Sequence, residues 1–251
     1  MNFKTFVLCF GILSMTSCKT PISYDKIEGR QITITDTLST DPNIEAYIKP
    51  FREHVNNNLD SVLSYAVDTY SKSDGHLNTA IGNFMADAIY EQSNPIFKKR
   101  SGNDIDFVLL NQGGIRAIIS KGNITTRTAF EVMPFENSIV VTKLKGEQIK
   151  ELLDYLIEAK RAHPISHLKI AIDAEGHLNN ATIKGQPIDY NKSYYVLTND
   201  YLMNGGDRMD FFKQRDTVYV LDYKIRNALI DYFSKTDTIR PVIDDRFIQL
   251  K

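Results

Sequence analysis

The chain has 251 residues, of which 42% are hydrophobic, and its 30 basic side chains nearly balance its 31 acidic ones. This length suffices for one large domain or two small ones. The balanced charge gives no reason to expect a nucleic-acid partner or a basic face that coats a membrane.

The first residues are typical of a secretory leader. Lys4 precedes an apolar run, Phe6–Met15, that is too short to cross a bilayer as a helix. The small residues before Cys18 resemble a bacterial lipobox, which implies a signal peptide at residues 1–17 and lipid attachment to the Cys18 sulfur. An ordinary signal peptide with a chance cysteine is the alternative. We expect a lipid-anchored protein of the cell envelope, facing the periplasm or on the outer membrane.

Cysteine usage limits the chemistry of the folded part. Cys9 and Cys18 both lie in the leader, so we expect no disulfide framework, thiolate metal site or cysteine nucleophile beyond it. Residues 18–30 are polar and predict a tether. Residues 31–251 show no break in composition and predict one domain.

Helices and strands are predicted in mixed order after the tether. Strands are expected at 31–35, 61–70, 105–111, 139–144, 168–173, 181–185, 193–200, 218–223 and 245–250. Helices are expected at 43–60, 79–93, 146–160 and 223–233, with one short helix in the loop 122–138. The helix at 146–160 is the clearest, because its apolar residues recur at i, i+3, i+4, i+7 and i+8. The lack of regular βαβ alternation favours an α+β fold.

The segment NQGGIR (111–116) follows an apolar strand and could hold a ligand. Its glycines permit positive φ and let a ligand approach the backbone N–H groups. Arg116 can direct two donors at a phosphate or carboxylate, and Asn111 offers both a donor and an acceptor. A tight turn with a surface arginine explains the segment equally well.

Two further segments have the same ambiguity. NDYLMNGGD (199–207) ends a strand and carries Tyr201, a glycine pair and Asp207, whose carboxylate could accept hydrogen bonds from a ligand or stabilise its own turn. Phe135, in MPFENS (133–138), is either a minor core residue or a flat face on which a base could stack.

Histidines give no metal signature. His163 and His167 are four residues apart, but Pro164 between them prevents the helix that would align them. We therefore predict that both are solvated loop residues and that neither binds metal. On the helix GNFMADA, Gly82 is expected to allow close packing and Asp87 to be a polar edge.

Five segments, taken together and in order, resemble the C-terminal domain of the 5′-nucleotidase family over roughly residues 30–250. They are GNFMADA (82–88), NQGGIRA (111–117), GNITTRTAFEVMPFENS (122–138), LKGEQIKELLDYL (144–156) and TNDYLMNGGD (198–207). This resemblance implies a layered α/β/β/α fold that binds the nucleoside end of a nucleotide.

The resemblance also implies six substrate-binding residues. They are Asn111, Gly114, Arg116, Phe135, Tyr201 and Asp207. The two aromatic rings would sandwich the base, and the carboxylate of the second glycine loop would hold the nucleoside. Tyr201 stands where many members have phenylalanine, which keeps the stacking face and adds a hydroxyl. Leu77 lies near a position where many members have arginine, so one phosphate-facing arginine is expected to be missing.

The family's chemistry lies in an N-terminal metallophosphoesterase domain that holds two metal ions. The segment before residue 30 is too short for such a domain. The resemblance thus implies the nucleotide-binding half of a split 5′-nucleotidase. It implies no catalytic residue, metal or cofactor in this chain, and divalent metals in a separate metallophosphoesterase chain. Two alternatives are a lipoprotein that binds nucleosides or nucleotides without turnover, and a structural protein whose pocket has decayed.

Overall fold

The computed structural model describes residues 26–250, so the predicted signal peptide, Cys18 and the first part of the tether lie outside the described residues. The chain divides into two units, of which one ends at Ile48 and the other begins at Lys49. The strand predicted at 31–35 is wrong, because these residues form no strand and are exposed. Their alternating pattern has neither a paired strand nor a core to pack on.

The helix predicted at 43–60 is α2, Pro42–Leu59. It begins after Asp41, whose carboxylate accepts hydrogen bonds from the backbone N–H groups of Asn43 and Ile44. No residue of α2 is buried. The helix therefore exists through local capping and periodicity rather than through a buried face.

A five-stranded sheet is central to the second unit. Its strands in spatial order are β10 (Thr217–Lys224), β4 (Ser138–Lys145), β9 (Ser193–Asn199), β2 (Phe107–Leu109) and β5 (Ile165–Ser166). Strands β2 and β9 are parallel neighbours, and the other pairs are antiparallel. Alternate side chains of the middle strands enter two different cores, so both faces of the sheet are covered.

The first core lies between this sheet and a group of helices with a small second sheet. The helices are α3 (Ala80–Ser101), α4 (Thr126–Val132) and α7 (Ile225–Lys235), and the sheet is β11 (Thr238–Ile239), β1 (Val62–Ala66) and β3 (Gly122–Thr125). Helix α3 begins where the Thr79 hydroxyl accepts a hydrogen bond from the Gly82 N–H group, and it ends at Gly102, which has positive φ.

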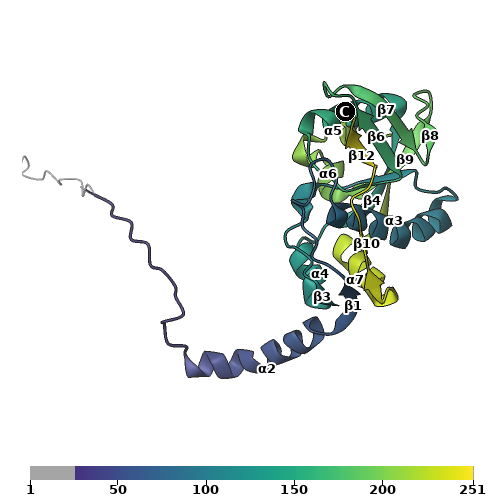
Figure 1. Ribbon diagram of the computed structural model, residues 1–251. Coiled ribbons are helices and arrows are strands. Elements are labelled where there is room, and N and C mark those ends of the chain that lie inside the picture. Colours follow the sequence, from purple (N-terminus) through teal and green to yellow (C-terminus); the bar gives the residue numbers. More distant parts are fainter. Residues whose placement is uncertain (1–25, 251) are drawn as a thin grey trace, which may run out of the picture. The chain divides into compact units, whose positions relative to one another are not determined.

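The second core lies on the other face of the central sheet. Helix α5 (Gly146–Ala159) contributes three fully buried leucines to it, and a third sheet covers it further. That sheet consists of β12 (Phe247–Gln249), β6 (Leu168–Ile172), β7 (Leu178–Ile183) and β8 (Gln186–Pro187). Figure 1 shows this sheet and α7 on opposite sides of β4.

The predicted α+β class is confirmed, and so are the 146–160 helix and the antiparallel pairing of the segments at 168–173 and 181–185. Two other predictions were incomplete. Helix α3 extends eight residues beyond 93 and contains Pro95, because the fully buried Phe97 packs edge-on against Tyr219. The loop predicted at 122–138 contains strand β3 as well as α4.

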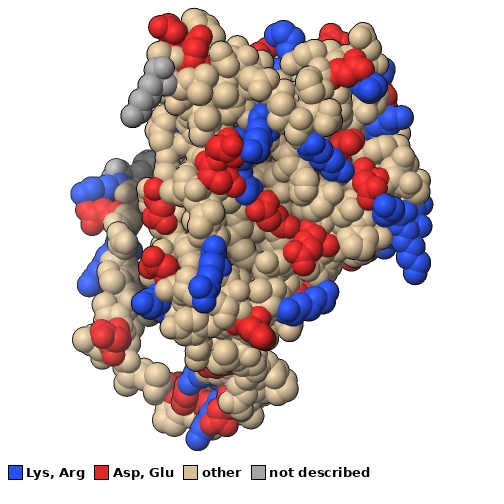
Figure 2. Space-filling model, turned by 45° about the vertical axis from the view of Figure 1, so that its right-hand side comes forward, with Lys and Arg blue, Asp and Glu red and all other residues tan. Residues whose placement is uncertain are grey.

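Charges on the surface are mixed in sign. Figure 2 shows basic and acidic side chains interspersed over the visible face, in keeping with the nearly balanced charge of the chain. Within residues 26–250, no helix has both the length and the apolar character that crossing a bilayer would require.

Candidate functional site

The parallel pairing of β2 with β9 brings two distant loops together. Asn111 follows β2 and Asn199 ends β9, and the Asn199 side-chain amide donates a hydrogen bond to Asn111 Oδ1 at 3.4 Å. Both asparagines are buried. Asn199 Oδ1 also accepts from the Leu202 N–H group at 2.8 Å, which starts the short helix α6 (Asp200–Met203). The two glycine loops are thus joined at their bases.

The first loop forms a 3₁₀ turn, η2 (Gln112–Gly114). The expected positive φ is absent from its two glycines. Close packing favours glycine at position 114 instead, because a Cβ there would lie 3.3 Å from Asn111 Oδ1. Arg116 donates to the Gly113 carbonyl at 3.4 Å, and its guanidinium carbon lies 5.8 Å from the centre of the Phe135 ring. This guanidinium and ring therefore stand over the same turn.

The second loop uses positive φ at three positions, Gly205 (86°), Asp207 (52°) and Arg208 (63°). Gly206 lies against the Tyr201 ring, where a Cβ would approach ring carbons to 2.5 Å. The Tyr201 hydroxyl donates to Asp207 Oδ1 at 2.9 Å and accepts from the Asp207 N–H group at 3.2 Å. The hydrogen bond to the Asp207 carboxylate raises the pKa of Tyr201. Asp207 is thus held by an aromatic side chain of its own loop.

Phe135 lies in the loop that connects α4 to β4, and Arg226 of α7 holds that loop. The Arg226 guanidinium donates to the carbonyls of Pro134 (3.2 Å) and Phe135 (3.5 Å) and pairs with the Glu136 carboxylate. Arg226 is only 7% exposed, although it is charged. It lies about ninety residues from the loop in sequence, so no local pattern could have identified it.

All six predicted site residues line one cavity of about 360 Å³, together with Gly113 and Asn137. Phe135 (41%) and Tyr201 (47%) are half-exposed, so both rings present a free apolar surface. The cavity thus combines two aromatic faces with an arginine, a carboxylate and side-chain amides. Such a set suits a flat, polar ligand that carries an anionic group.

Asn137 is the lining side chain that sequence reasoning missed. It stands two residues after Phe135 in MPFENS, at the start of an extended stretch that continues into β4. Because alternate residues of extended chain share a face, this spacing was the available signal.

Leu77 and Arg127 lie outside this cavity. Leu77 is 6% exposed and belongs to the second core, so a hydrophobic contact occupies the position near which an arginine was expected. Arg127 pairs with Asp60 at 2.7 Å and donates to Asn56 Oδ1 at 3.1 Å, which fixes the end of α2. Arg116 is the arginine that lines the cavity in the described part of the chain.

The prediction of two solvated histidines is wrong for His163, which is 4% exposed. Its Nδ1 atom accepts a hydrogen bond from the Gln112 N–H group at 3.3 Å, and its Nε2 atom has no partner. Burial lowers the pKa of His163 to about 4, so the imidazole is neutral near pH 7. His167 is exposed and stacks on Tyr90. Among residues 26–250, no group of three or more His, Cys, Asp or Glu side chains is placed to hold a metal ion.

Comparison with known proteins gives consistent matches. The family model for the 5′-nucleotidase C-terminal domain matches residues 59–214. The cell wall protein Lmo0130 of Listeria monocytogenes is 28% identical over 74% of this chain and 26% of its own length. Protein UshA of Yersinia enterocolitica is 25% identical over 85% of this chain and 39% of its own length.

A solved structure gives the same result for the fold. The 5′-nucleotidase precursor from Thermus thermophilus superposes with a TM-score of 0.69 at 25% identity, over 82% of this chain and 42% of that one. This chain therefore spans between about a quarter and two fifths of the length of these relatives.

Proposed function

Because the chain belongs to the 5′-nucleotidase C-terminal domain family, we propose that it binds the nucleoside part of a nucleotide in the 360 Å³ cavity. The observation that carries this proposal is the convergence of three separate loops on one cavity, two of them with a half-exposed aromatic ring. Every base has a π-face, so two such rings can hold a base without reading its identity.

Each lining residue has a proposed part in binding. Phe135 and Tyr201 hold the base, and Asp207 accepts hydrogen bonds from the ribose hydroxyls. Arg116 directs its guanidinium at the phosphate. Asn111 and Gly114 shape the turn beneath the ligand, which is supported by the close approach of their atoms.

Hydrolysis, in this proposal, takes place on a metallophosphoesterase domain supplied by a separate chain, and two divalent metals there activate the attacking water. No step of that chemistry is assigned to residues of this chain.

The proposed location is the cell envelope, with a lipid on Cys18 as anchor. The leader-like sequence supports this, and so does the similarity to a protein named as a cell wall protein. Mass spectrometry of the membrane-extracted protein tests the anchor, because a lipidated N-terminal Cys18 has a mass that simple signal cleavage does not produce.

Calorimetric titration tests nucleotide binding, since the chain has no tryptophan to report it by fluorescence. AMP and adenosine are titrated into the wild-type protein and the Phe135→Ala and Tyr201→Ala variants. Tyr190→Ala is the matched control, because Tyr190 is similarly exposed (46%) and does not line the cavity. Binding that is lost in the first two variants and kept in the control supports the proposal, and no binding by the wild type contradicts it.

A second candidate function is nucleotide binding without turnover. It is favoured by the fact that one cavity of this chain brings together two aromatic rings, an arginine and a carboxylate, which are groups suited to binding a nucleotide. The two candidates differ in a mixing experiment with a secreted metallophosphoesterase, Mn²⁺ and AMP. Phosphate release above that of the partner alone supports the split enzyme, and binding without such a gain supports the second candidate.

A further inference from the structure

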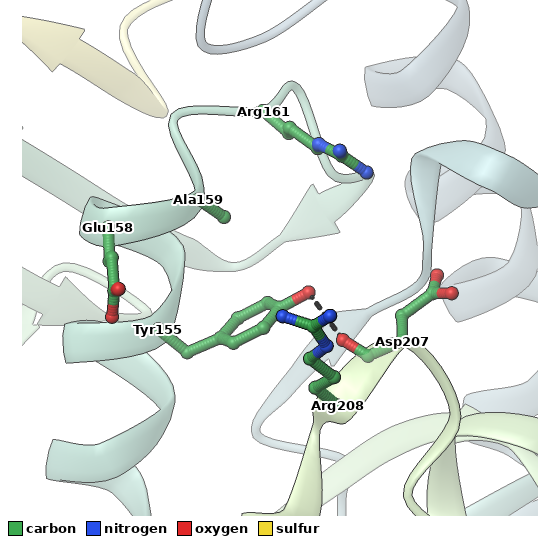
Figure 3. A pocket seen from close by; sticks show the side chains of 6 residues that line it. All are labelled: Tyr155, Glu158, Ala159, Arg161, Asp207 and Arg208. Carbon is green, nitrogen blue, oxygen red and sulfur yellow. Dashed lines mark hydrogen bonds between the residues drawn. The ribbon is translucent and has the colours of Figure 1, made fainter.

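A second cavity of about 630 Å³ lies beside the candidate nucleotide site. Figure 3 shows its six lining residues, which are Tyr155, Glu158, Ala159, Arg161, Asp207 and Arg208. Asp207 lines both cavities and is the wall between them. The side of Asp207 that faces the second cavity is fixed by Tyr155, whose hydroxyl donates to the Asp207 carbonyl at 2.9 Å.

Two unpaired guanidinium groups line this cavity. Neither Arg161 nor Arg208 forms an ion pair or a side-chain hydrogen bond within the described part of the chain. They come from different elements, since Arg161 follows α5 and Arg208 belongs to η3 (Gly206–Arg208). Two forked donors that approach one space from two sides suit an oxyanion with several acceptor oxygens.

The two arginines act on the same hydroxyl. Burial and the Asp207 charge raise the pKa of Tyr155, while the charges of Arg161 and Arg208 act in the opposite direction. Both guanidinium groups are therefore within electrostatic range of the Tyr155 hydroxyl.

The backbone at Arg208 is costly for its residue type. Its φ of 63° lies in the left-handed region, which is unfavourable for an L-residue with a Cβ. Asp207 before it adopts the same region. Such strain is concentrated at functional positions, and here it presents the Arg208 side chain to the cavity.

Two carboxylates, those of Asp207 and Glu158, also line the second cavity. The Asp207 carboxylate is bonded to the Tyr201 hydroxyl, and Tyr201 lines the nucleotide cavity but not the second one. In Figure 3, Glu158 lies on the other side of the Tyr155 ring from Arg161 and Asp207. The side of the Tyr155 ring on which Arg161 lies thus carries one of the two carboxylates, Asp207, rather than both.

We propose that the second cavity binds a phosphomonoester on the ribose 2′ or 3′ oxygen of a nucleotide whose base lies between Phe135 and Tyr201. This inference rests on the proposed function, in which Asp207 accepts hydrogen bonds from the ribose hydroxyls. A phosphate on the 2′ or 3′ oxygen extends past Asp207 into the second cavity and reaches Arg161 and Arg208. The preferred ligand class is then a nucleoside bisphosphate rather than a simple 5′-monophosphate.

Calorimetric titration of the full chain tests this inference. The probes are AMP, adenosine 3′,5′-bisphosphate and adenosine 2′,5′-bisphosphate, each at low and at physiological salt. We expect at least one bisphosphate to bind about tenfold or more tightly than AMP, as one good charge-assisted contact provides. Arg161→Gln combined with Arg208→Gln should remove this gain and leave AMP affinity within about twofold.

Arg240→Gln is the matched control, because Arg240 lines a different cavity and its loss changes the net charge in the same direction. Thermal unfolding of each variant verifies that it is folded. Equal affinity for AMP and both bisphosphates overturns the inference and leaves the proposed function intact. A gain that survives in the double arginine variant also overturns it. Failure of every nucleotide to bind overturns the proposed function as well.

Discussion

The guanidinium carbon of Arg226 lies 4.1 Å from the centre of the Phe130 ring, and this contact connects α7 to α4. The same guanidinium donates to the backbone carbonyls of Pro134 and Phe135. One buried side chain thereby fixes the helix before the loop and the loop that carries Phe135. The position of this aromatic ring is thus set from the first core and not by the loop sequence alone.

Replacement of Arg226 by glutamine should loosen this loop. Charge-assisted hydrogen bonds to two carbonyls are lost, so we expect a fall of roughly 2 kcal/mol in the free energy of unfolding. AMP affinity should fall further than stability alone explains, because Phe135 is no longer held. Urea denaturation and calorimetry measure the two effects. Glu136→Gln is the control, since Glu136 is exposed and its replacement keeps the carbonyl contacts; an equal loss there would contradict the role of the backbone contacts.

Tyr201 should contribute to binding through both its ring and its hydroxyl. Tyr201→Phe keeps the ring and removes both hydrogen bonds to Asp207, so AMP affinity should fall by about 1 kcal/mol, or fivefold. Tyr201→Ala also removes the stacking face, so its AMP affinity should be lower than that of Tyr201→Phe by about a further 1–3 kcal/mol. Calorimetry separates the two variants. Identical affinities in both would show that the ring does not contact the base.

Gly206→Ala should displace the Tyr201 ring, because the added Cβ would lie 2.5 Å from its carbons. The φ at this position is not in the left-handed region, so the backbone itself is not strained. We expect AMP affinity to fall about tenfold, as for loss of one stacked ring, with little change in the melting temperature. Gly29→Ala, where no atom lies within 4 Å of the added Cβ, is the control. Unchanged affinity in Gly206→Ala would contradict a role for this ring position.

His163 should make stability depend on pH. Its pKa is about 4 in the folded state because of burial, and about 6.5 in an unfolded chain. Above pH 6.5 the imidazole is neutral in both states and the stability is full. As the pH falls from 6.5 towards 4, the unfolded state takes up a proton that the folded state does not, so up to about 3 kcal/mol is lost.

Denaturation measured between pH 4 and pH 7 checks this effect. His163→Asn keeps an acceptor for the Gln112 N–H group and should flatten the dependence between pH 6.5 and 4. An NMR titration midpoint near 6.5 for the folded His163 imidazole would disprove the assignment.

Much of the fold could be predicted because the strongest signals are periodic. In α5, Leu152, Leu153 and Leu156 are all fully buried, as their spacing requires. Short strands were less predictable. Strand β3 (Gly122–Thr125) is only four residues long and has one buried side chain, so it resembles a loop in sequence. Its strand conformation depends on pairing with β1, which sequence does not report.

Part of the candidate site could likewise be predicted from the sequence, and part could not. Asn111 and Tyr201 each stand a few residues before a glycine pair at a strand end, where a ligand loop is expected, and the structure brings them to one cavity. Arg226 and His163 could not be found, because their environments come from packing between distant segments. The burial of His163 results from contacts with Tyr155 and the Gln112 backbone, both on other elements. The spacing of His163 and His167, with Pro164 between them, describes only the local chain. It does not report which distant residues pack around His163.

The parallel pairing of β2 with β9 has a consequence for how the protein folds. Phe107 pairs with Val196, so the chain must close a loop of nearly ninety residues before the two glycine loops can meet. Such long-range pairing is slow compared with helix formation. The ability to bind a ligand should therefore arise late in folding, after helices such as α5 have formed, and recovery of binding should trail recovery of helical circular dichroism in a refolding experiment.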